Sequence, residues 1–237
     1  MELSKRLTAV AALVTPGGRL ADVGTDHGYI PIYLAKKGMI SHAVAMDINK
    51  GPLLRAQDHI FREHLEEKIE TRRSDGLKEL SPGEADTAVI AGMGGALTVS
   101  ILGEGGRILD GLKELILQPQ SEIAKVRYWL EENGWQITDE DMVEEDGKYY
   151  PMMKAVPGKM HRLSETEACY GPILLEKKHP CLLQYLRWEQ EIKEKVLIQL
   201  DQAAGANVLE RRHQLEEILK RNRRAQEMLR EDSGRGL

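Results

Sequence analysis

The fold is decided by the stretch Asp22-Val23-Gly24-Thr25-Asp26-His27-Gly28-Tyr29. It follows a short apolar pattern over residues 19–23, which predicts a buried strand, and it precedes a helical pattern over residues 30–37. In open parallel sheets, ligands bind beyond the carboxyl ends of the strands, near the point where the strand order reverses. Gly24 allows the backbone to turn sharply there and to approach a ligand closely. The stretch therefore predicts a ligand-binding loop in an α/β protein, although an ordinary tight turn with solvated acids would also fit these residues.

The charge of this loop indicates the kind of ligand. The pattern G-x-G-x-x-G, which cradles a pyrophosphate, is absent, and the carboxylates of Asp22 and Asp26 would repel phosphates. A sulfonium with an amino-acid tail carries no phosphate and is positively charged, so carboxylates suit it. We therefore predict that the loop binds S-adenosylmethionine, through Asp22, Gly24, Thr25, Asp26, His27 and Gly28.

Two later strands are predicted to end in residues that suit the same ligand. The strand at residues 42–48 ends near Asp47, 25 residues after Asp22, where an acid typically binds the ribose hydroxyls. The strand at residues 68–73 leads into Ser74-Asp75-Gly76, where an acid and a glycine could hold the adenine amino group. Either acid alone could equally be a helix cap or a turn residue. The predicted cofactor ligands at these two ends are Asp47, Ile48, Asp75 and Gly76.

A fourth strand, predicted at residues 86–91, leads into Ala91-Gly92-Met93-Gly94-Gly95. These glycines leave room for the methionine tail or for a flat substrate, or they form only a flexible turn before a helix. We predict Ala91, Gly92 and Met93 as cofactor ligands and Gly94 as a substrate contact. Many enzymes that methylate exocyclic amines carry Asn or Asp, then Pro-Pro and an aromatic residue here. That pattern is absent, so the sequence does not support exocyclic amine methylation of the common type.

The remaining apolar patterns predict an alternating fold. Helices are expected at residues 3–14, 51–65 and 97–109, and a strand is centred on residues 115–117. A further helix is expected to begin with Ser121 as its cap and to run to residue 133. Strands at residues 135–143 and 149–156 are expected to be joined by the acidic turn Glu144-Glu145-Asp146-Gly147. Strands that alternate with helices predict a doubly wound, mostly parallel sheet. The closing pair of strands suits the methyltransferase version of this fold, in which a hairpin adds an antiparallel strand at the edge.

The C-terminal third of the chain has a different pattern. The best domain boundary lies at residues 156–159, which divides the chain into domains at residues 1–158 and 159–237. Ser164 and Glu167 form a plausible capping box, and Gly171-Pro172 ends that short helix. Two long helices are expected on either side of a turn at residues 205–207. The first follows Pro180 and has an apolar side made of Leu182, Tyr185, Ile192, Val196 and Leu200. The second has residues spaced by seven, namely Val208, Leu215, Asn222 and Leu229. This pattern predicts an antiparallel coiled-coil hairpin, and its short turn favours pairing within one chain, so a monomer is expected.

Composition limits the classes of protein to which this chain can belong. The net charge of −5 argues against non-specific binding to nucleic acid, but the charge is uneven, because residues 159–237 carry 15 basic and 13 acidic residues. The two cysteines, Cys169 and Cys181, fit neither a metal site nor a disulfide framework, so no metal is expected. No apolar run approaches the length of a membrane span, and nothing resembles a signal peptide. We therefore expect a soluble cytoplasmic protein without a membrane partner.

Together these motifs resemble one known family. The run from Asp22 to Pro31, with Ala91-Gly92-Met93-Gly94-Gly95 and the coiled-coil tail, resembles the bacterial TrmK family, and further matches lie at residues 117–120 and 170–172. Members of that family methylate N1 of adenosine at nucleotide 22 of tRNA. The resemblance spans essentially the whole chain. It implies a Rossmann-like class I methyltransferase domain with a mostly parallel seven-stranded sheet, a C-terminal helical domain, S-adenosylmethionine as the cofactor and tRNA as the substrate.

The implied reaction suggests roles for particular residues. Asp26 is a candidate catalytic residue, because it could accept a hydrogen bond from the adenine amino group or orient the cofactor, and Tyr29 is a candidate to stack on the base. Lys and Arg contact phosphate without reading sequence. The candidates for this contact with tRNA include Lys5 and Arg6 near the N-terminus and Arg223 and Arg224 in the last helix, and each could equally be a solvated surface charge.

Two other functions share many of these features. A methyltransferase acting on a small molecule or a protein would need the same cofactor loop but not the helical hairpin. A non-catalytic adaptor could bind S-adenosylmethionine and recruit a partner through its coiled coil. A nicotinamide oxidoreductase is disfavoured, because the phosphate-binding glycine pattern is absent from the first loop.

Overall fold

The computed structural model describes residues 2–200 and 206–230, and the chain forms two compact units, Met1–Arg162 and Leu163–Leu237. Each unit is described by itself. The predicted division after residue 158 stays a prediction. In the described part, no helix is long and apolar enough to cross a bilayer.

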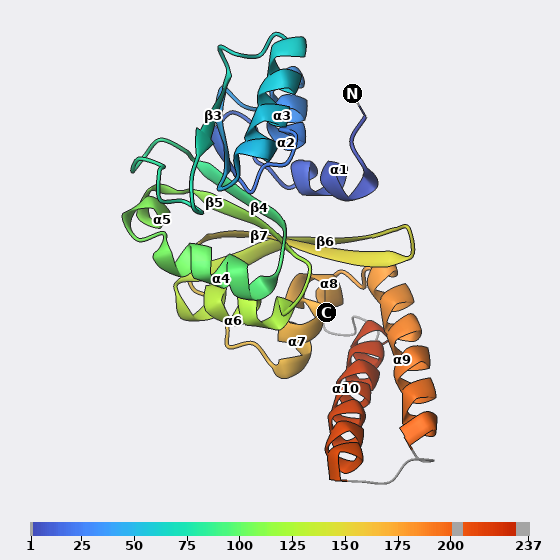
Figure 1. Ribbon diagram of the computed structural model, residues 1–237. Coiled ribbons are helices and arrows are strands. Elements are labelled where there is room, and N and C mark those ends of the chain that lie inside the picture. Colours follow the sequence, from blue (N-terminus) through green and yellow to red (C-terminus); the bar gives the residue numbers. More distant parts are fainter. Residues whose placement is uncertain (1, 201–205, 231–237) are drawn as a thin grey trace. The chain divides into compact units, whose positions relative to one another are not determined.

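The first unit is built on a sheet of seven strands in the order β3-β2-β1-β4-β5-β7-β6 (Figure 1). The strands are β1 (Arg19–Val23), β2 (His42–Asp47), β3 (Ile69–Arg73), β4 (Thr87–Met93), β5 (Glu114–Pro119), β6 (Trp135–Glu145) and β7 (Lys148–Pro157). The first five strands are parallel, and β7 pairs antiparallel with both β5 and β6. The predicted doubly wound sheet with a closing hairpin is therefore confirmed.

Helices cover both faces of this sheet. They are α1 (Lys5–Ala12), α2 (Tyr29–Lys36), α3 (Lys50–Arg62), α4 (Gly95–Glu104), α5 (Arg107–Gly111) and α6 (Ile123–Glu132). Figure 1 shows α2 and α3 on one side of the sheet and α4 and α6 on the other. The helix predicted over residues 97–109 is two helices, because Gly105 and Gly106 interrupt it and Gly106 takes a φ of +44°.

The closing hairpin has a tighter turn than the sequence predicts. Glu144 and Glu145 belong to β6, and Glu145 pairs with Lys148, so the turn consists of Asp146 and Gly147 alone. Both have positive φ, +52° and +73°. A two-residue hairpin loop favours this backbone because its twist matches that of the strands.

The predicted Ser121 cap of α6 is wrong. Glu122 is the N-cap residue, and no side chain caps this helix. The Ser121 carbonyl instead accepts a hydrogen bond from the Gly95 N–H at 2.9 Å, and the Glu122 carboxylate accepts one from the Ala96 N–H at 3.3 Å. The segment before α6 therefore contacts the start of α4 rather than closing its own helix.

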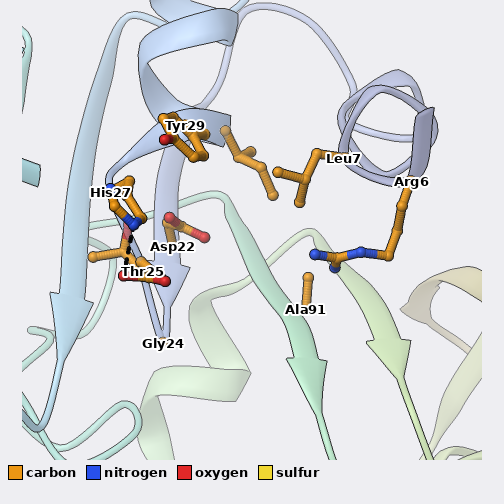
Figure 2. Close-up of a pocket in the computed structure, with 10 residues that line it drawn as sticks. Arg6, Leu7, Asp22, Gly24, Thr25, His27, Tyr29 and Ala91 are labelled. Atoms are coloured by element: carbon orange, nitrogen blue, oxygen red, sulfur yellow. Dashed lines mark ion pairs between the residues drawn. The ribbon is translucent and has the colours of Figure 1, made fainter. Parts of the chain in front are cut away.

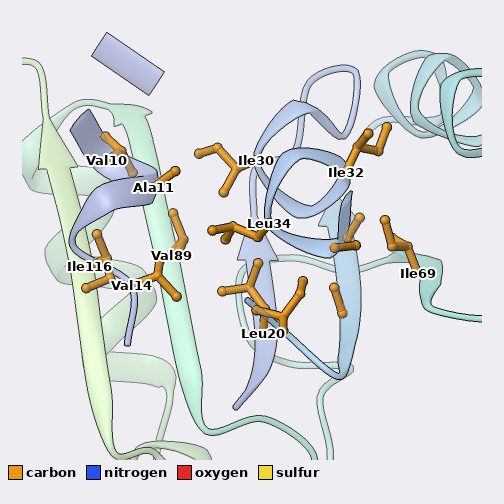
Figure 3. Close-up of a cluster of buried hydrophobic side chains, with 14 of the residues drawn as sticks. Val10, Ala11, Val14, Leu20, Ile30, Ile32, Leu34, Ile69, Val89 and Ile116 are labelled. Atoms are coloured by element: carbon orange, nitrogen blue, oxygen red, sulfur yellow. The ribbon is translucent and has the colours of Figure 1, made fainter. Parts of the chain in front are cut away.

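The main apolar core fixes α1 and α2 on the sheet. Figure 3 shows Leu20, Val89 and Ile116 from β1, β4 and β5 beside apolar side chains of both helices. Val10 of α1 and Leu34 of α2 are fully buried in this cluster. Because α1 is held over β5 and β6, its first turn lies close to the edge of the sheet where the ligand loop was predicted.

The second unit is helical, with α7 (Glu165–Tyr170), α8 (Pro172–Glu176), α9 (Pro180–Leu200) and α10 (Ala206–Arg230). The capping box between Ser164 and Glu167 is present, as predicted. Of the predicted turn, Gly205 lies outside the described residues, and α10 already begins at Ala206.

A buried polar cluster joins α9 and α10. Asn222 is fully buried and donates to the Leu186 carbonyl and to the Glu189 carboxylate, both at 2.9 Å. These bonds join the C-terminal half of α10 to the N-terminal half of α9, so the helices run antiparallel. The apolar side predicted for α9 is partly wrong, because Ile192 is 37% exposed whereas Glu189 is buried. Glu189 can be buried because the hydroxyls of Tyr170 and Tyr185 also donate to it. The coiled-coil character of the pair stays a prediction.

Candidate active site

The carboxyl ends of the central strands form the framework of the site. The strand order reverses between β1 and β4, because the chain first adds strands on one side of β1 and then on the other. Asp22 of β1 pairs with Ala45 of β2 and with Val89 of β4. Asp22 therefore lies at the reversal point, where open α/β sheets bind their ligands.

A pocket of about 180 Å³ opens beside Asp22 (Figure 2). The end of β1 and the following loop contribute Asp22, Gly24, Thr25, Asp26 and His27, and the start of α2 contributes Tyr29 and Ile30. The other lining residues are Arg6 and Leu7 from α1 and Ala91 from β4. The structure thus brings together five predicted residues of the first loop, Tyr29 and the predicted Ala91.

The Asp22 carboxylate is a buried charge in this pocket. The residue is only 5% exposed, and it forms no ion pair with any residue that the structure describes. Burial raises the pKa of Asp22 to about 6, the Thr25 hydroxyl acts in the opposite direction, and the negative charge of Asp47 adds to the rise. Because an unpaired buried carboxylate is costly, the pocket suits a ligand that brings a positive charge to it.

The loop after β1 is held on β2 by its backbone. The N–H groups of Gly24 and Thr25 both donate to the Met46 carbonyl at 2.8 Å. Gly24 has a φ of +77°, and a Cβ on it would lie 2.0 Å from the Cε of Met93. Gly28 starts α2 with a φ of +66° and is buried against Ala56 rather than lining the pocket. Both glycines therefore shape the loop through conformation and close packing.

The outer part of the loop carries an ion pair and a group of aromatic rings. Asp26 has a side chain that is 62% exposed and pairs with Arg55 of α3 at 2.6 Å. The rings of His27 and Tyr29 are nearly parallel, with centroids 5.0 Å apart, and His59 of α3 lies 5.3 Å and 5.5 Å from them. The Nδ1 of His59 also lies 3.0 Å from the His27 carbonyl oxygen, within hydrogen-bonding distance. Contacts from Arg55 and His59 of α3 therefore fix the position of the loop.

The residues predicted to hold adenosine lie at the ends of β2 and β3, outside this pocket. Asp47 is half-buried and accepts a hydrogen bond from the Asn49 N–H at 2.7 Å, and Ile48 is 50% exposed beside it. Asp75 is exposed and pairs with Lys78 at 2.5 Å. The predicted Gly76 has a φ of +62° and packs against Ile101. The two ends are adjacent, because the Ser74 N–H donates to the Asp47 carbonyl at 3.0 Å.

The end of β4 is irregular where the glycines were predicted to matter. The pairing with β5 shifts between Ala91 and Met93, and the intervening Gly92 has a φ of +83°. A Cβ on Gly92 would lie 3.7 Å from Arg6 Nη1, so this turn faces the guanidinium. Gly94 is the N-cap residue of α4 and lies outside the pocket around Asp22.

Comparisons with known proteins identify the family of this site. A methyltransferase-domain family model matches residues 3–153. The tRNA (adenine(22)-N(1))-methyltransferase of Bacillus subtilis is 36% identical over 217 residues, which cover 86% of this chain and 88% of that enzyme. The chain belongs to the bacterial TrmK family of methyltransferases.

Solved structures of the TrmK family share the fold of this chain, and two of them hold the cofactor or its product. Sp1610 of Streptococcus pneumoniae in complex with S-adenosyl-L-methionine superimposes with a TM-score of 0.85 at 34% identity, over 94% of this chain and 99% of that one. TrmK of M. capricolum in complex with S-adenosyl-homocysteine gives a TM-score of 0.83 at 26% identity, over 97% of this chain and all of that one.

The four cations predicted to contact tRNA lie in different surroundings in this TrmK-family chain. Lys5 is tied to the β6–β7 turn, since its backbone N–H donates to Glu145 at 2.6 Å and its Nζ to the Glu144 carbonyl at 2.9 Å. Arg6 instead lines the pocket. Arg223 and Arg224 lie on α10 in the second unit, with side chains 62% and 56% exposed.

Several residues of the TrmK-family pocket were missed by the sequence analysis. Leu7 and Ile30 were not distinguished from ordinary core residues, because nothing local says which apolar side chains border a cavity. Arg55 and His59 lie outside the pocket lining, and their contacts with the loop were not predicted. Their spacing carried a usable signal, since residues four apart lie on the same face of a helix.

Proposed function

We propose that this protein transfers a methyl group from S-adenosyl-L-methionine to N1 of adenosine 22 in tRNA. The observation that carries the proposal is the match to the B. subtilis enzyme, which extends over 86% of the chain and therefore beyond the methyltransferase domain. Residues 163–237 have no place in a minimal cofactor-binding fold, which favours a large substrate over a small molecule.

The residues around the pocket fit the cofactor. Asp22 is a buried carboxylate with no ion-pair partner among the described residues, and the ligand's α-ammonium group would provide one. Asp47 and Ile48 lie at the adjacent strand end, where an acid can bind ribose hydroxyls and an exposed apolar side chain can cover adenine. Asp75 and Gly76 at the end of β3 extend the same edge.

Methyl transfer to adenine N1 needs no strong acid or base from the protein. S-adenosylmethionine supplies a methyl group activated by a sulfonium, and adenine N1 has an in-plane lone pair at neutral pH. The residues of the site therefore act by positioning the base and excluding water. Asp26 is exposed at the mouth of the pocket, where its carboxylate can accept a hydrogen bond from the adenine amino group. Tyr29, with its ring parallel to His27, offers a face on which the base can stack.

A target inside folded tRNA has to leave its stack before it can enter such a pocket. Lys5, Arg223 and Arg224 are the cations that we assign to phosphate contacts. The protein acts as a cytoplasmic monomer in this proposal.

The decisive experiment is methyl transfer from labelled S-adenosylmethionine to unmodified bulk tRNA, with the modified nucleoside identified by mass spectrometry. We expect N1-methyladenosine, and a transcript in which adenosine 22 is replaced by guanosine should accept no label. Methylation of another atom or position would refute the substrate assignment. Binding of the cofactor without transfer to any RNA would instead favour the non-catalytic adaptor.

A further inference from the structure

Arg6 occupies a position that phosphate binding does not explain. It belongs to the first turn of α1, yet its side chain reaches toward Ala91 at the end of β4 and lines the pocket (Figure 2). Its Nη1 donates to the Oε1 of Gln118 at 2.9 Å, and Gln118 is fully buried at the end of β5. Its guanidinium carbon also lies 5.6 Å from the centre of the Tyr150 ring. The guanidinium is therefore held in a fixed orientation by two partners from distant parts of the first unit.

Most of the hydrogen-bonding capacity of Arg6 remains available. A guanidinium has five N–H donors, and among the described residues Arg6 donates only to Gln118. It forms no ion pair with Asp22, although both line the same pocket. A pre-oriented arginine with spare donors is well suited to a carboxylate, which it can bind through two parallel hydrogen bonds.

The pocket thus presents opposite charges to one ligand. Asp22 offers a buried carboxylate, and Arg6 offers a guanidinium from another wall. This arrangement is complementary to a zwitterionic α-amino acid group, whose ammonium would face Asp22 and whose carboxylate would face Arg6. A phosphate of tRNA satisfies only one of the two charges and would meet repulsion from Asp22.

We propose that Arg6 binds the carboxylate of the methionine moiety of S-adenosylmethionine and is not a tRNA phosphate contact. This inference rests on the proposed function, because it assumes that this pocket holds that cofactor. The role of Gln118 is to hold the guanidinium, so Gln118 is a positioning residue. Gly92 has no side chain and therefore leaves space beside the Nη1 of Arg6. A Cβ added to Gly92 would lie 3.7 Å from this atom, in ordinary van der Waals contact.

The test measures cofactor binding by calorimetry without RNA. Two ligands are compared: S-adenosylhomocysteine and its decarboxylated analogue, which lacks only the carboxylate. Wild type, Arg6→Ala and Arg6→Lys are titrated with both, and Lys37→Ala is the matched control, because it removes an equal charge from the exposed end of α2 outside the pocket. Thermal unfolding of each variant verifies that it is folded.

We expect Arg6→Ala to weaken S-adenosylhomocysteine about ten- to a hundredfold, the range for a charge-assisted hydrogen bond. The decarboxylated analogue should change less than twofold, Arg6→Lys should give an intermediate loss, and Lys37→Ala should have no effect. Equal weakening of both ligands would overturn the inference, because Arg6 would then only support the pocket. Unchanged binding of S-adenosylhomocysteine to Arg6→Ala would overturn it. A separate filter assay in which this variant binds tRNA more weakly, and with less dependence on salt, would then assign Arg6 to a phosphate contact.

The proposed function can fail separately. A wild-type protein that shows the expected dependence on Arg6 but methylates no tRNA would support this inference and refute the substrate. A wild-type protein that binds neither ligand would refute both.

Discussion

Replacing Asp22 by Asn should stabilise the folded protein while abolishing its cofactor binding. Burial raises the pKa of Asp22 to about 6, against an ordinary value of 3.8. At about 1.4 kcal/mol per pKa unit, ionised Asp22 costs the folded state about 3 kcal/mol. Well below pH 4 the carboxyl is protonated in both states, so it costs nothing. Between pH 4 and 6 the unfolded chain releases this proton first, so wild-type stability falls as pH rises, and above pH 7 the cost is constant.

The assay is urea denaturation of wild type and Asp22→Asn at pH 5 and at pH 8. The variant should have the larger unfolding free energy at both, and its advantage should grow by about 1.4 kcal/mol between them. Calorimetry should show no binding of S-adenosylhomocysteine to the variant, because an amide cannot compensate the α-ammonium charge. A variant that is less stable than wild type at pH 8, or an advantage independent of pH, would refute the reasoning that an unpaired charge is stored in this pocket.

Three further perturbations test other parts of the molecule. Asp26→Ala should lower kcat for tRNA methylation about ten- to a hundredfold in steady-state assays, because the hydrogen bond that the adenine amino group donates to a charged acceptor is lost, while the unfolding free energy stays the same. Replacing both Arg223 and Arg224 by Glu should weaken tRNA binding in filter assays and reduce the slope of log affinity against log salt by about 2, since two phosphate contacts are removed. Arg127→Ala should lower the unfolding free energy by about 3–5 kcal/mol in urea denaturation, because it removes one member of a buried ion pair, in which Arg127 lies 2.8 Å from the carboxylate of Glu140.

Each of these has a control. Asp58→Ala removes an exposed acid that pairs with Arg62 on the surface of α3, so it should leave kcat unchanged. Unchanged turnover in Asp26→Ala itself would remove Asp26 from the mechanism. An unaltered salt slope would show that α10 only braces its unit. Replacing Arg127 and Glu140 together by Met and Leu should cost much less than Arg127→Ala, and an equal cost would contradict the account of a buried ion pair.

The elements that could be predicted are those whose signal is local. The strand at residues 19–23 matches β1 residue for residue, because its buried apolar run is closed by a glycine turn. The position of the loop after β1 could be predicted because it follows from strand order alone, and Asp22 lies at the reversal of that order, as predicted.

The features that were missed depend on contacts between distant segments. Glu189 looks like a solvent residue in sequence, and only Tyr170, Tyr185 and Asn222 make its burial possible. Arg6 looked like a surface cation, because its direction depends on where α1 packs and on Gln118, 112 residues away. Helical periodicity identifies the face of α1 that is buried but not the strand ends that its first turn approaches.

The attachment of α1 to the closing hairpin has a consequence for how the protein is made. Lys5 is bound by Glu144 and Glu145, 139 and 140 residues later in the chain, and Arg6 lies over Tyr150 of β7. During synthesis at the ribosome, β1 to β4 can pair as they emerge, but the first helix has no hairpin to bind until most of the first unit has been translated. Closing so long a loop is slow because its entropic cost precedes any stabilising contact. We therefore expect the earliest segment of the chain to be the last to reach its native place, so a nascent chain should acquire affinity for the cofactor only once β7 has left the exit tunnel.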